Sequence, residues 1–258
     1  MAVITLLTDF GSTDYFVPSM KGVILSINPS ATIVDITHDV PKFNILRAAF
    51  ILKSAYKWFP KGTIHVVVVD PGVGTTRKSI AIRGRGHVFV GPDNGVLSLA
   101  AEEDGVVEVR EIKSSGNASF TFHGRDIFAP TAARLSAGME FSDVGPVTEF
   151  QRLELTRPRW VDGSLVATII YIDSFGNAFT NVTADQLRVD YGAALDVELQ
   201  DGSRVRVRME RSYGYVSPGE PLALINSEGY LELAVNQGSF ADKFKAVPGA
   251  SIRITPIR

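Results

Sequence analysis

Several features are missing from this 258-residue chain, and each absence narrows its possible functions. The chain has no cysteine, which excludes disulfide bonds, thiolate metal sites and a cysteine nucleophile. Its net charge is −2 at pH 7, so no basic field points to nucleic acid or to a membrane surface. No apolar run reaches the roughly 18 residues of a membrane span, and the N-terminus lacks the basic segment of a signal peptide. We therefore expect a cytoplasmic protein with no nucleic-acid or membrane partner.

The first half of the chain alternates two kinds of segment. Three apolar, β-branched runs are typical of strands, and the two segments between them have apolar residues at helical spacing. In chain order these segments are 2–8, 14–28, 31–37, 43–59 and 62–70. This order predicts a parallel sheet with right-handed crossovers. We expect further strands at 79–83 and 87–91 and a helix over 126–138.

The composition changes after residue 150. The stretch "TRPRWVDGS" has the proline and polar residues of a linker, and short β-like runs with Asp-Gly and Glu-Gly turns follow it. We predict an α/β protein with two domains joined by a linker over 151–160. Residues 1–150 would form an N-terminal α/β domain with a parallel sheet, and residues 161–258 a smaller, antiparallel, barrel-like β domain.

Acidic side chains follow the first three predicted strands. Asp9 ends the first strand, His38 and Asp39 end the second, and Asp70 ends the third. In open parallel sheets, ligands bind outside the carboxyl ends of the strands. We therefore expect these acids to gather at one edge of the sheet, where a ligand would lie. The spacing around His38 fits no metal-ligand pattern, and we predict no metal site.

The valine strand runs into a loop with a carboxylate and a guanidinium, "HVVVVDPGVGTTR" at residues 65–77. The loop is neither a Walker A motif nor a GxGxxG fingerprint. One interpretation is a tight turn in which Arg77 pairs with a surface acid. The other is that Asp70 and Arg77 orient a water or a polar ligand atom.

A second polar cluster, "FHGRDIFAP", precedes the helix predicted over 126–138. Asp126 is most simply the N-cap of that helix, and Arg125 could pair with it. His123 stands before a glycine at the expected strand-to-helix loop. A single histidine of this kind is more often structural than catalytic, so both roles stay open.

Two polar clusters also occur in the second domain. "IDSFGNAFTN" places Asp173, Asn177 and Asn181 around Phe175 and a glycine, and "LINSEGY" follows later. Each could be a plain β-turn or hairpin built by Asp, Asn and Gly. Taken singly, neither cluster is specific for a ligand.

Read in order, seven segments resemble the S-adenosyl-L-methionine hydroxide adenosyltransferases, hydrolase relatives of the fluorinase and chlorinase enzymes. The resemblance extends from residue 3 to about residue 244. The segments are "TDFGSTDYFVPSMKGVI", "DITHDVPKFNILRAAFIL", "VVVVDPGVGTTR", "FVGPDNGVLS", "TFHGRDIFAP", "IDSFGNAFTN" and "ALINSEGYLELAVNQGSFA".

This resemblance implies an N-terminal α/β domain, a C-terminal β domain, and a homotrimer. Each site would lie between the N-domain of one chain and the C-domain of its neighbour. The implied reaction is attack of water or hydroxide at C5′ of the ribose of S-adenosyl-L-methionine, which gives adenosine and L-methionine without a cofactor.

The resemblance also assigns residues of the first domain. Asp70, Arg77 and His123 correspond to an Asp–Arg–His trio that acts on the water. The halogenase relatives lack this charged trio, so its presence argues for water as the nucleophile. Asp9 corresponds to the acid that holds the ribose diol, and Phe43 to an aromatic side chain that packs near the ribose.

In the second domain the implied roles concern adenine and methionine. Asp173 would pair with the methionine ammonium, Asn177 would bind the adenine edge, and Tyr213 would stack on adenine. Ser227 corresponds to a residue at the methionine carboxylate. The next position is Arg in the fluorinase and Glu228 here, and a carboxylate there would suit the ammonium end instead.

Two alternatives remain open from sequence. The first is a halogenase that uses the same carbon, which chloride-dependent products would reveal. The second is a protein that binds or senses S-adenosyl-L-methionine or a nucleoside without turnover, which would retain intact ligand and release no products.

Overall fold

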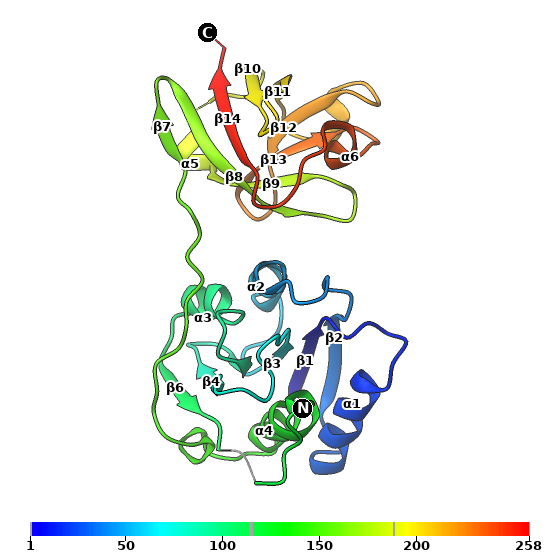
Figure 1. Cartoon of the computed structure of the whole chain (residues 1–258), viewed down its shortest axis with the longest axis vertical. Coiled ribbons are helices and arrows are strands. Elements are labelled where there is room, and N and C mark those ends of the chain that lie inside the picture. The colour runs from blue at the N-terminus through cyan, green and yellow to red at the C-terminus, as the bar shows by residue number, and fades with distance from the viewer. Residues whose placement is uncertain (1, 114–115, 188, 258) are drawn as a thin grey trace. The chain divides into compact units, whose positions relative to one another are not determined.

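The structure is a computed structural model that describes residues 2–113, 116–187 and 189–257. The chain divides into two compact units, Met1–Leu153 and Glu154–Arg258 (Figure 1). The division falls within the 151–160 segment. Among the described residues, every helix is too short or too polar to cross a membrane.

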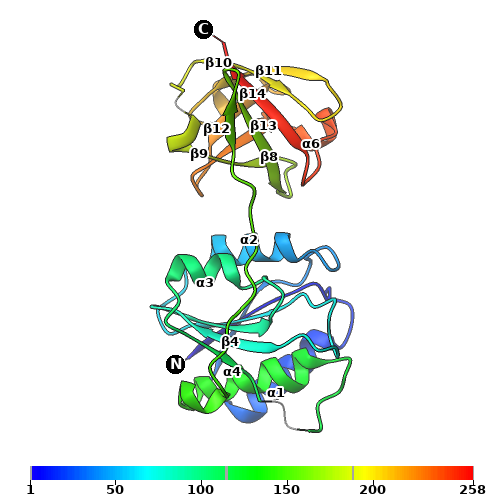
Figure 2. The same cartoon turned by 60° about the vertical axis from the view of Figure 1, so that its left-hand side comes forward.

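The N-terminal unit contains a six-stranded sheet with the order β2-β1-β3-β5-β4-β6. Helices α1 and α4 cover one face of this sheet, and α2 and α3 cover the other (Figure 2). The strands are β1 (Val3–Thr8), β2 (Thr32–Thr37), β3 (Ile64–Val68), β4 (Ser79–Arg83), β5 (Val88–Pro92) and β6 (Glu108–Glu111). The helices are α1 (Phe16–Ile27), α2 (Ile45–Tyr56), α3 (Ser98–Asp104) and α4 (Ala129–Ser136), with a 3-10 turn, η2 (Phe141–Val144).

This sheet is mixed. Strands β2, β1, β3 and β5 are parallel, as the alternating pattern predicts. Strand β4 is antiparallel to both β5 and β6, a direction that the alternating pattern does not predict. The physical reason is the short connection between β4 and β5, residues 84–87. Such a connection forms a hairpin, whereas a parallel crossover needs about a dozen residues.

The middle strand fixes where the site lies. All five residues of β3 are buried, because apolar side chains from α1 and α4 pack on one side of it and those from α2 and α3 on the other. This explains the continuous valine run, which is typical of a strand covered on both faces. The strand therefore presents Asp70, two residues beyond its end, from a rigid position.

Two parts of the N-terminal unit differ from the sequence prediction. The pattern does not predict α3 or β6, which have seven and four residues. The helix predicted over 126–138 begins earlier, with a π-helical turn, η1 (Gly124–Phe128), and continues as α4. Turns of this kind occur often at functional sites.

The C-terminal unit is a closed barrel, which confirms the predicted barrel-like β fold. Its sheet runs β14-β10-β11-β12-β13-β9-β8, and β8 pairs again with β14, while β7 extends the sheet from β8. The strands are β7 (Arg159–Val161), β8 (Ser164–Ile172), β9 (Ala178–Thr183), β10 (Ala194–Glu198), β11 (Arg204–Met209), β12 (Pro221–Ile225), β13 (Tyr230–Val235) and β14 (Ser251–Pro256). Short helical turns are α5 (Ala184–Leu187), η3 (Tyr213–Tyr215) and α6 (Phe240–Phe244).

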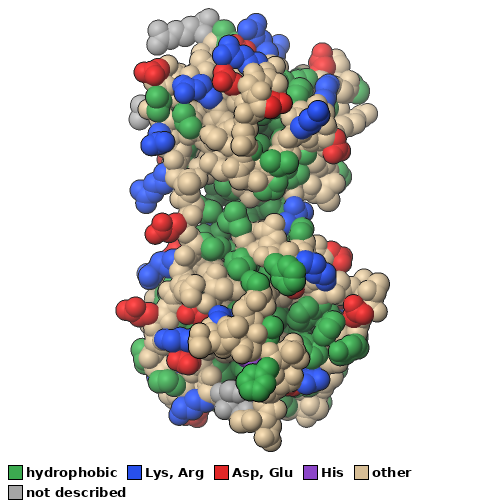
Figure 3. Space-filling model, viewed as in Figure 1, with side chains coloured by type: hydrophobic (Ala, Val, Ile, Leu, Met, Phe, Trp, Pro, Cys, Tyr) green, Lys and Arg blue, Asp and Glu red, His purple; other side chains and the backbone are tan. Residues whose placement is uncertain are grey.

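The barrel strands alternate between core and surface. Leu231, Leu233 and Val235 of β13 belong to the apolar core of the barrel, as do Val205 and Val207 of β11. The β11–β12 pairing is parallel, and the other pairings are antiparallel. On the surface, Lys and Arg side chains are interspersed with Asp and Glu side chains (Figure 3).

Candidate active site

A cavity of about 310 Å³ lies at the carboxyl ends of β1 and β3. Four residues singled out from the sequence line it together: Asp9, Phe43, Asp70 and His123. The sequence did not single out the other lining residues as parts of a site, and three of them are phenylalanines. They include Phe10, Phe16, Phe122 and Lys42.

The third acid expected at this edge does not line the cavity. Asp39 is two residues beyond the end of β2, and it is exposed and is not among the lining residues. His38 is buried, with its Nδ1 2.9 Å from the Thr8 hydroxyl and its Nε2 3.1 Å from the Asp35 carboxylate. The register of β2 against β1 shifts at Leu6 and Leu7, and such a bulge redirects the side chains that follow it.

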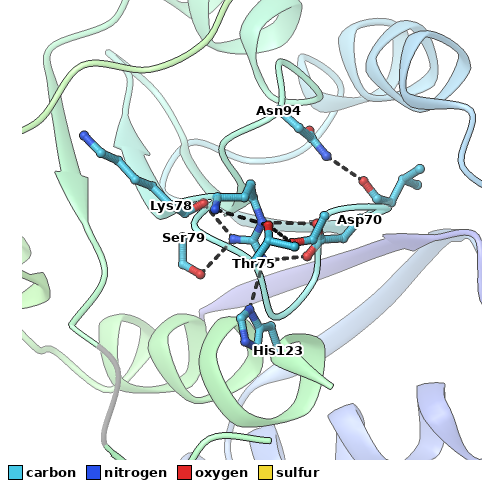
Figure 4. A network of polar contacts seen from close by, with 9 residues as sticks. Asp70, Thr75, Lys78, Ser79, Asn94 and His123 are labelled. Carbon is cyan, nitrogen blue, oxygen red and sulfur yellow. Dashed lines mark hydrogen bonds and ion pairs between the residues drawn. The ribbon is translucent and has the colours of Figure 1, made fainter. Parts of the chain in front are cut away.

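The Arg77 guanidinium holds the candidate site together. It donates two hydrogen bonds to Asp70, from Nε to Oδ1 at 3.1 Å and from Nη2 to Oδ2 at 2.6 Å. Its Nη2 also lies 2.9 Å from His123 Nδ1, and its Nη1 donates to the Lys78 carbonyl and the Ser79 hydroxyl at 2.6 and 3.0 Å (Figure 4). The Arg77 and Asp70 side chains are only 7% and 4% exposed. The interpretation of Arg77 as the partner of a surface acid is therefore wrong.

This contact fixes the protonation state of His123. A guanidinium can only donate hydrogen bonds, so His123 Nδ1 must be the acceptor. The imidazole is then neutral and carries its proton on Nε2. Burial lowers the pKa of His123, and the Arg77 charge lowers it further. Burial raises the pKa of the Asp70 carboxyl, and Arg77 offsets part of that rise.

The loop between β3 and β4 needs its glycine to bring these side chains together. Gly74 has φ of +75°, and a Cβ there would lie 2.2 Å from the Phe120 carbonyl oxygen. The close packing joins the Arg77 loop to the segment that carries His123. The Asn94 amide also donates to the Val69 carbonyl at 2.9 Å and so ties down the residue before Asp70 (Figure 4).

Asp126 does not cap the helix, contrary to the prediction. The residue at the N-cap of η1 is His123, and its side chain makes no capping hydrogen bond. Asp126 instead accepts from the Ser119 backbone N–H at 2.9 Å and pairs with Arg125 at 2.6 and 2.9 Å, which confirms the Arg125 contact. The Arg125 guanidinium lies 4.9 Å from the ring centre of Phe122, which lines the cavity. Asp126 therefore anchors the loop before His123.

Asp9 and Phe43 are joined through the backbone. The Phe43 N–H donates to Asp9 Oδ2 at 2.8 Å, and the Lys42 ammonium donates to the Asp9 carbonyl oxygen. Asp9 is buried, whereas the Phe43 side chain is 66% exposed. Phe43 has φ of +64°, a left-handed conformation that is costly for any residue other than glycine. Such strain at a cavity wall suggests that the ring is needed there.

A second cavity, of about 610 Å³, lies in the C-terminal unit. Asp173, Asn177 and Tyr213 line it, together with Phe175 and Gln237. Asp173 Oδ1 accepts from the backbone N–H groups of Phe175 and Asn177, both at 2.9 Å, and its Oδ2 accepts from the Asn177 amide at 3.0 Å. The β-turn interpretation of this segment is confirmed, and the same turn forms part of a cavity wall.

Three other residues singled out in this unit do not line that cavity. Asn181 bonds to the backbone of Thr156 and Thr168. Ser227 and Glu228 lie in the hairpin between β12 and β13, where the Glu228 N–H donates to Asn226 Oδ1 at 3.0 Å. The hairpin interpretation of this segment is confirmed, and the ligand roles of Ser227 and Glu228 stay predictions. Across the described ranges, no group of three or more His, Asp or Glu side chains is placed to hold a metal ion.

Comparisons with known proteins agree with this architecture. The N-terminal domain model of the SAM hydroxide adenosyltransferases matches residues 4–145, and the C-terminal domain model matches residues 167–253. A curated (R)-S-adenosyl-L-methionine hydrolase from Salinispora tropica is 38% identical over 98% of this chain and 97% of its own length. One from Thermus thermophilus is 35% identical over 98% of this chain and 100% of its own length.

More distant relatives and solved structures also match. A fluorinase from Actinopolyspora mzabensis is 28% identical over 98% of this chain and 97% of its own length. The crystal structure of an uncharacterized conserved protein from Thermotoga maritima has 40% sequence identity and a TM-score of 0.92. That match covers 98% of this chain and 99% of the Thermotoga chain.

Proposed function

The chain belongs to the SAM hydroxide adenosyltransferase family, and we propose that it hydrolyses S-adenosyl-L-methionine to adenosine and L-methionine. The relatives named (R)-S-adenosyl-L-methionine hydrolase support this reaction. The observation that carries the proposal is the buried Asp70–Arg77–His123 trio, two members of which line the cavity that also holds Asp9. The trio favours an enzyme, which has to position a water molecule. A protein that only senses the ligand needs no such group.

The proposed step is an in-line displacement at C5′. The water oxygen forms a bond to C5′ while the C5′–S bond breaks, and the electron pair of that bond stays on sulfur. The sulfonium becomes the neutral thioether of methionine, so the leaving group needs no acid. One proton of the water is released. The protein has to hold one water in line and keep other water away.

The trio supplies both contacts that this water needs. His123, with its proton on Nε2, would donate a hydrogen bond to one lone pair of the water and leave the other free to attack. Asp70 has acceptor capacity beyond its two bonds to Arg77, because a carboxylate offers about four lone-pair sites. It would accept a water proton, and its raised pKa suits that task. Arg77 would hold both groups in place.

The remaining residues would bind the substrate. We assign the ribose diol to Asp9 and the ribose face to Phe43. We assign the adenine and methionine groups to the C-terminal unit, through Asp173, Asn177, Tyr213, Ser227 and Glu228. We further propose a homotrimer in which the N-terminal unit of one copy meets the C-terminal unit of another, as the family resemblance implies.

Product analysis tests the reaction. Purified protein is incubated with S-adenosyl-L-methionine, with and without chloride, and the products are separated and identified by mass. We expect equal amounts of adenosine and methionine in both samples. A 5′-chlorinated nucleoside would support the halogenase alternative, and intact bound ligand without products would support the sensor.

Mixing two inactive variants tests the shared site. His123→Ala inactivates the part of the site that the N-terminal unit contributes. Asp173→Ala inactivates the part that the C-terminal unit contributes. If each site combines two chains, mixed trimers contain some sites with both halves intact, and the mixture regains part of the activity. If each site belongs to one chain, the mixture stays as inactive as its components.

A further inference from the structure

A buried carboxylate lies beside the C-terminal cavity and has no role in the scheme above. Glu232 of β13 is 1% exposed. Its neighbours Leu231 and Leu233 point into the barrel core, so Glu232 lies on the opposite face of the strand. On that face Val216 packs against Leu222 and Leu224. The segment around Val216 therefore covers a face of the barrel that would otherwise be exposed to solvent.

Among the described residues, Glu232 makes no ion pair. The Tyr213 hydroxyl donates to its Oε1 at 2.7 Å, and the Asn226 side chain is a second, neutral hydrogen-bond partner. The nearby charged group is another acid, Asp173. Burial raises the pKa of the Glu232 carboxyl, and the charge of Asp173 raises it further. A buried carboxylate without a cation is costly, and a neutral side chain of similar size would avoid that cost.

The covering segment has other contacts besides that of Tyr213. The Asn236 amide donates to the Val216 carbonyl at 2.7 Å, and the Gly219 N–H donates to the Asn236 carbonyl at 2.7 Å. The Ser217 N–H also donates to the Glu220 carboxylate at 2.9 Å. The two bonds to Asn236 anchor the segment, and the Ser217 bond closes a turn within it. None of these bonds uses the Glu232 charge.

Tyr213 connects the buried charge to the cavity. Its ring forms part of the cavity wall, while its hydroxyl bonds to Glu232. A hydrogen bond to a carboxylate polarises the phenol and makes the whole ring more negative, which favours a positively charged group in the cavity. Asp173 adds a second negative charge to the same wall, and no Lys, Arg or His lines this cavity in the part of the chain that the structure describes.

We propose that Glu232, acting through Tyr213, makes the C-terminal cavity selective for a positively charged ligand. Glu232 is then a positioning residue, because it acts on the ligand through Tyr213. This inference rests on the proposed function, in which the substrate carries a sulfonium and an ammonium group. The free energy lost by burying the charge is recovered when the cation binds.

Binding of stable ligands tests this selectivity without turnover. The probes are sinefungin, in which an amine-bearing carbon replaces the sulfonium, S-adenosyl-L-homocysteine, which has a neutral sulfur, and adenosine. Titration calorimetry on the full-length protein gives each Kd. In the wild type we expect sinefungin to bind about tenfold more tightly than S-adenosyl-L-homocysteine. Glu232→Gln keeps an acceptor for Tyr213 and removes the charge, so this ratio should fall to about one to two.

Matched variants separate charge from structure. Glu198→Gln removes an exposed carboxylate of the same unit, which pairs with Arg204, and should keep the wild-type ratio. The adenosine Kd of Glu232→Gln should change less than about twofold, because adenosine is neutral. Tyr213→Phe takes away the hydrogen bond that favours the charged form and should also lower the ratio.

Two results would overturn the inference. The first is a folded Glu232→Gln variant with the wild-type Kd ratio. The second, which needs no variant, is a wild type that binds both analogues equally. Failure of the proposed hydrolysis appears separately, as a wild type that binds sinefungin selectively and releases no adenosine from S-adenosyl-L-methionine.

Discussion

The two units contain the same chemical pair in two settings. In the N-terminal unit Arg77 binds Asp70 through two hydrogen bonds, with side chains 7% and 4% exposed. In the C-terminal unit Arg206 binds Asp196 in the same forked way, across β10 and β11, with side chains 70% and 41% exposed. The hydrogen bond to Arg206 lowers the pKa of Asp196, whereas burial raises the pKa of Asp70.

The difference shows where chemistry can arise. An exposed pair is screened by water and contributes little, so Arg206 and Asp196 form part of an ordinary charged surface. The buried pair is fixed by Ser79 and by the Lys78 carbonyl, and it has a third partner, His123, at a cavity wall. A pair of opposite charges is therefore not the signal of a site. A site is indicated when the pair is buried, when all the guanidinium donors are hydrogen-bonded, and when a third, titratable side chain contacts the pair.

The largest expected effect comes from the buried trio. We expect His123→Ala and Asp70→Asn to lower kcat by roughly 10²- to 10⁴-fold, the usual loss when a positioned acid–base group is removed. KM for S-adenosyl-L-methionine should change much less, because neither residue is assigned to substrate binding. Steady-state kinetics measures both constants, and near-wild-type kcat in both variants would refute the role of the trio.

Asp9 shares the cavity with the trio and should respond differently. Asp9→Ala removes the acceptor assigned to the ribose diol, so we expect KM to rise by roughly 10- to 100-fold, the range for hydrogen bonds to a charged group. The change in kcat should be the smaller effect. Asp9→Asn, which keeps one acceptor oxygen, should give an intermediate KM. Unchanged KM and kcat in Asp9→Ala would contradict the ribose assignment.

The pH dependence of kcat should follow the trio. The mechanism needs Asp70 ionised and His123 neutral, so kcat is lost as the pH falls and is constant above neutrality. Burial raises the pKa of Asp70 from its ordinary value, and burial with Arg77 lowers that of His123. A limb due to Asp70 should therefore lie above about pH 3.9, and one due to His123 below about pH 6.5, the ordinary values of the two groups. A single limb centred below about pH 3.9 would show that Asp70 does not control the rate.

Substitution of Phe43, whose backbone is strained, should have smaller effects. Glycine at this position should relieve the strain, whereas loss of the ring should weaken substrate binding. Glycine adopts φ of +64° without the steric cost that other residues have. Phe43→Gly should exceed Phe43→Ala in unfolding free energy by about 1 kcal/mol, measured by urea denaturation. Both variants should bind S-adenosyl-L-methionine more weakly than the wild type. Wild-type KM in both would show that the ring does not contact the substrate.

The smallest effect is expected at the exposed pair. Asp196→Asn should leave kcat, KM and the pH profile at their wild-type values, because this carboxylate is 41% exposed and lines neither cavity. It is the matched control for Asp70→Asn, with the same change of residue in the same kind of ion pair. A large loss of kcat in Asp196→Asn would remove the distinction between the two pairs.

Local sequence patterns predict most of the fold. The valine run, the helical spacing on either side and the Asp-Gly and Glu-Gly turns lead to the parallel strands and to the hairpins of the barrel. The antiparallel β4 is missed because strand direction depends on the length of a turn and not on the strand residues. That Asp39 lies outside the cavity wall is not predicted, because the register shift between β1 and β2 has no signature in the residues themselves.

Local sequence patterns predict less of the site than of the fold. Asp70 can be found because it ends a buried strand, but its contact with His123 joins residues 46 or more positions apart through Arg77. Only the family resemblance brings these residues together from sequence. Asp126 is assigned a capping role because the earlier π-helical turn is not predicted. Glu232 has the position of a solvent-facing residue in β13, and the sequence does not show that another segment covers it.

Isotope labelling tests whether the buried trio directs water to C5′. The protein is incubated with S-adenosyl-L-methionine in water enriched in oxygen-18, and the adenosine is analysed by mass spectrometry. We expect one heavy oxygen in the 5′-hydroxyl of adenosine and release of unlabelled methionine, with the rate greatly reduced in Asp70→Asn. Adenosine without label, or intact substrate after prolonged incubation, would contradict this expectation.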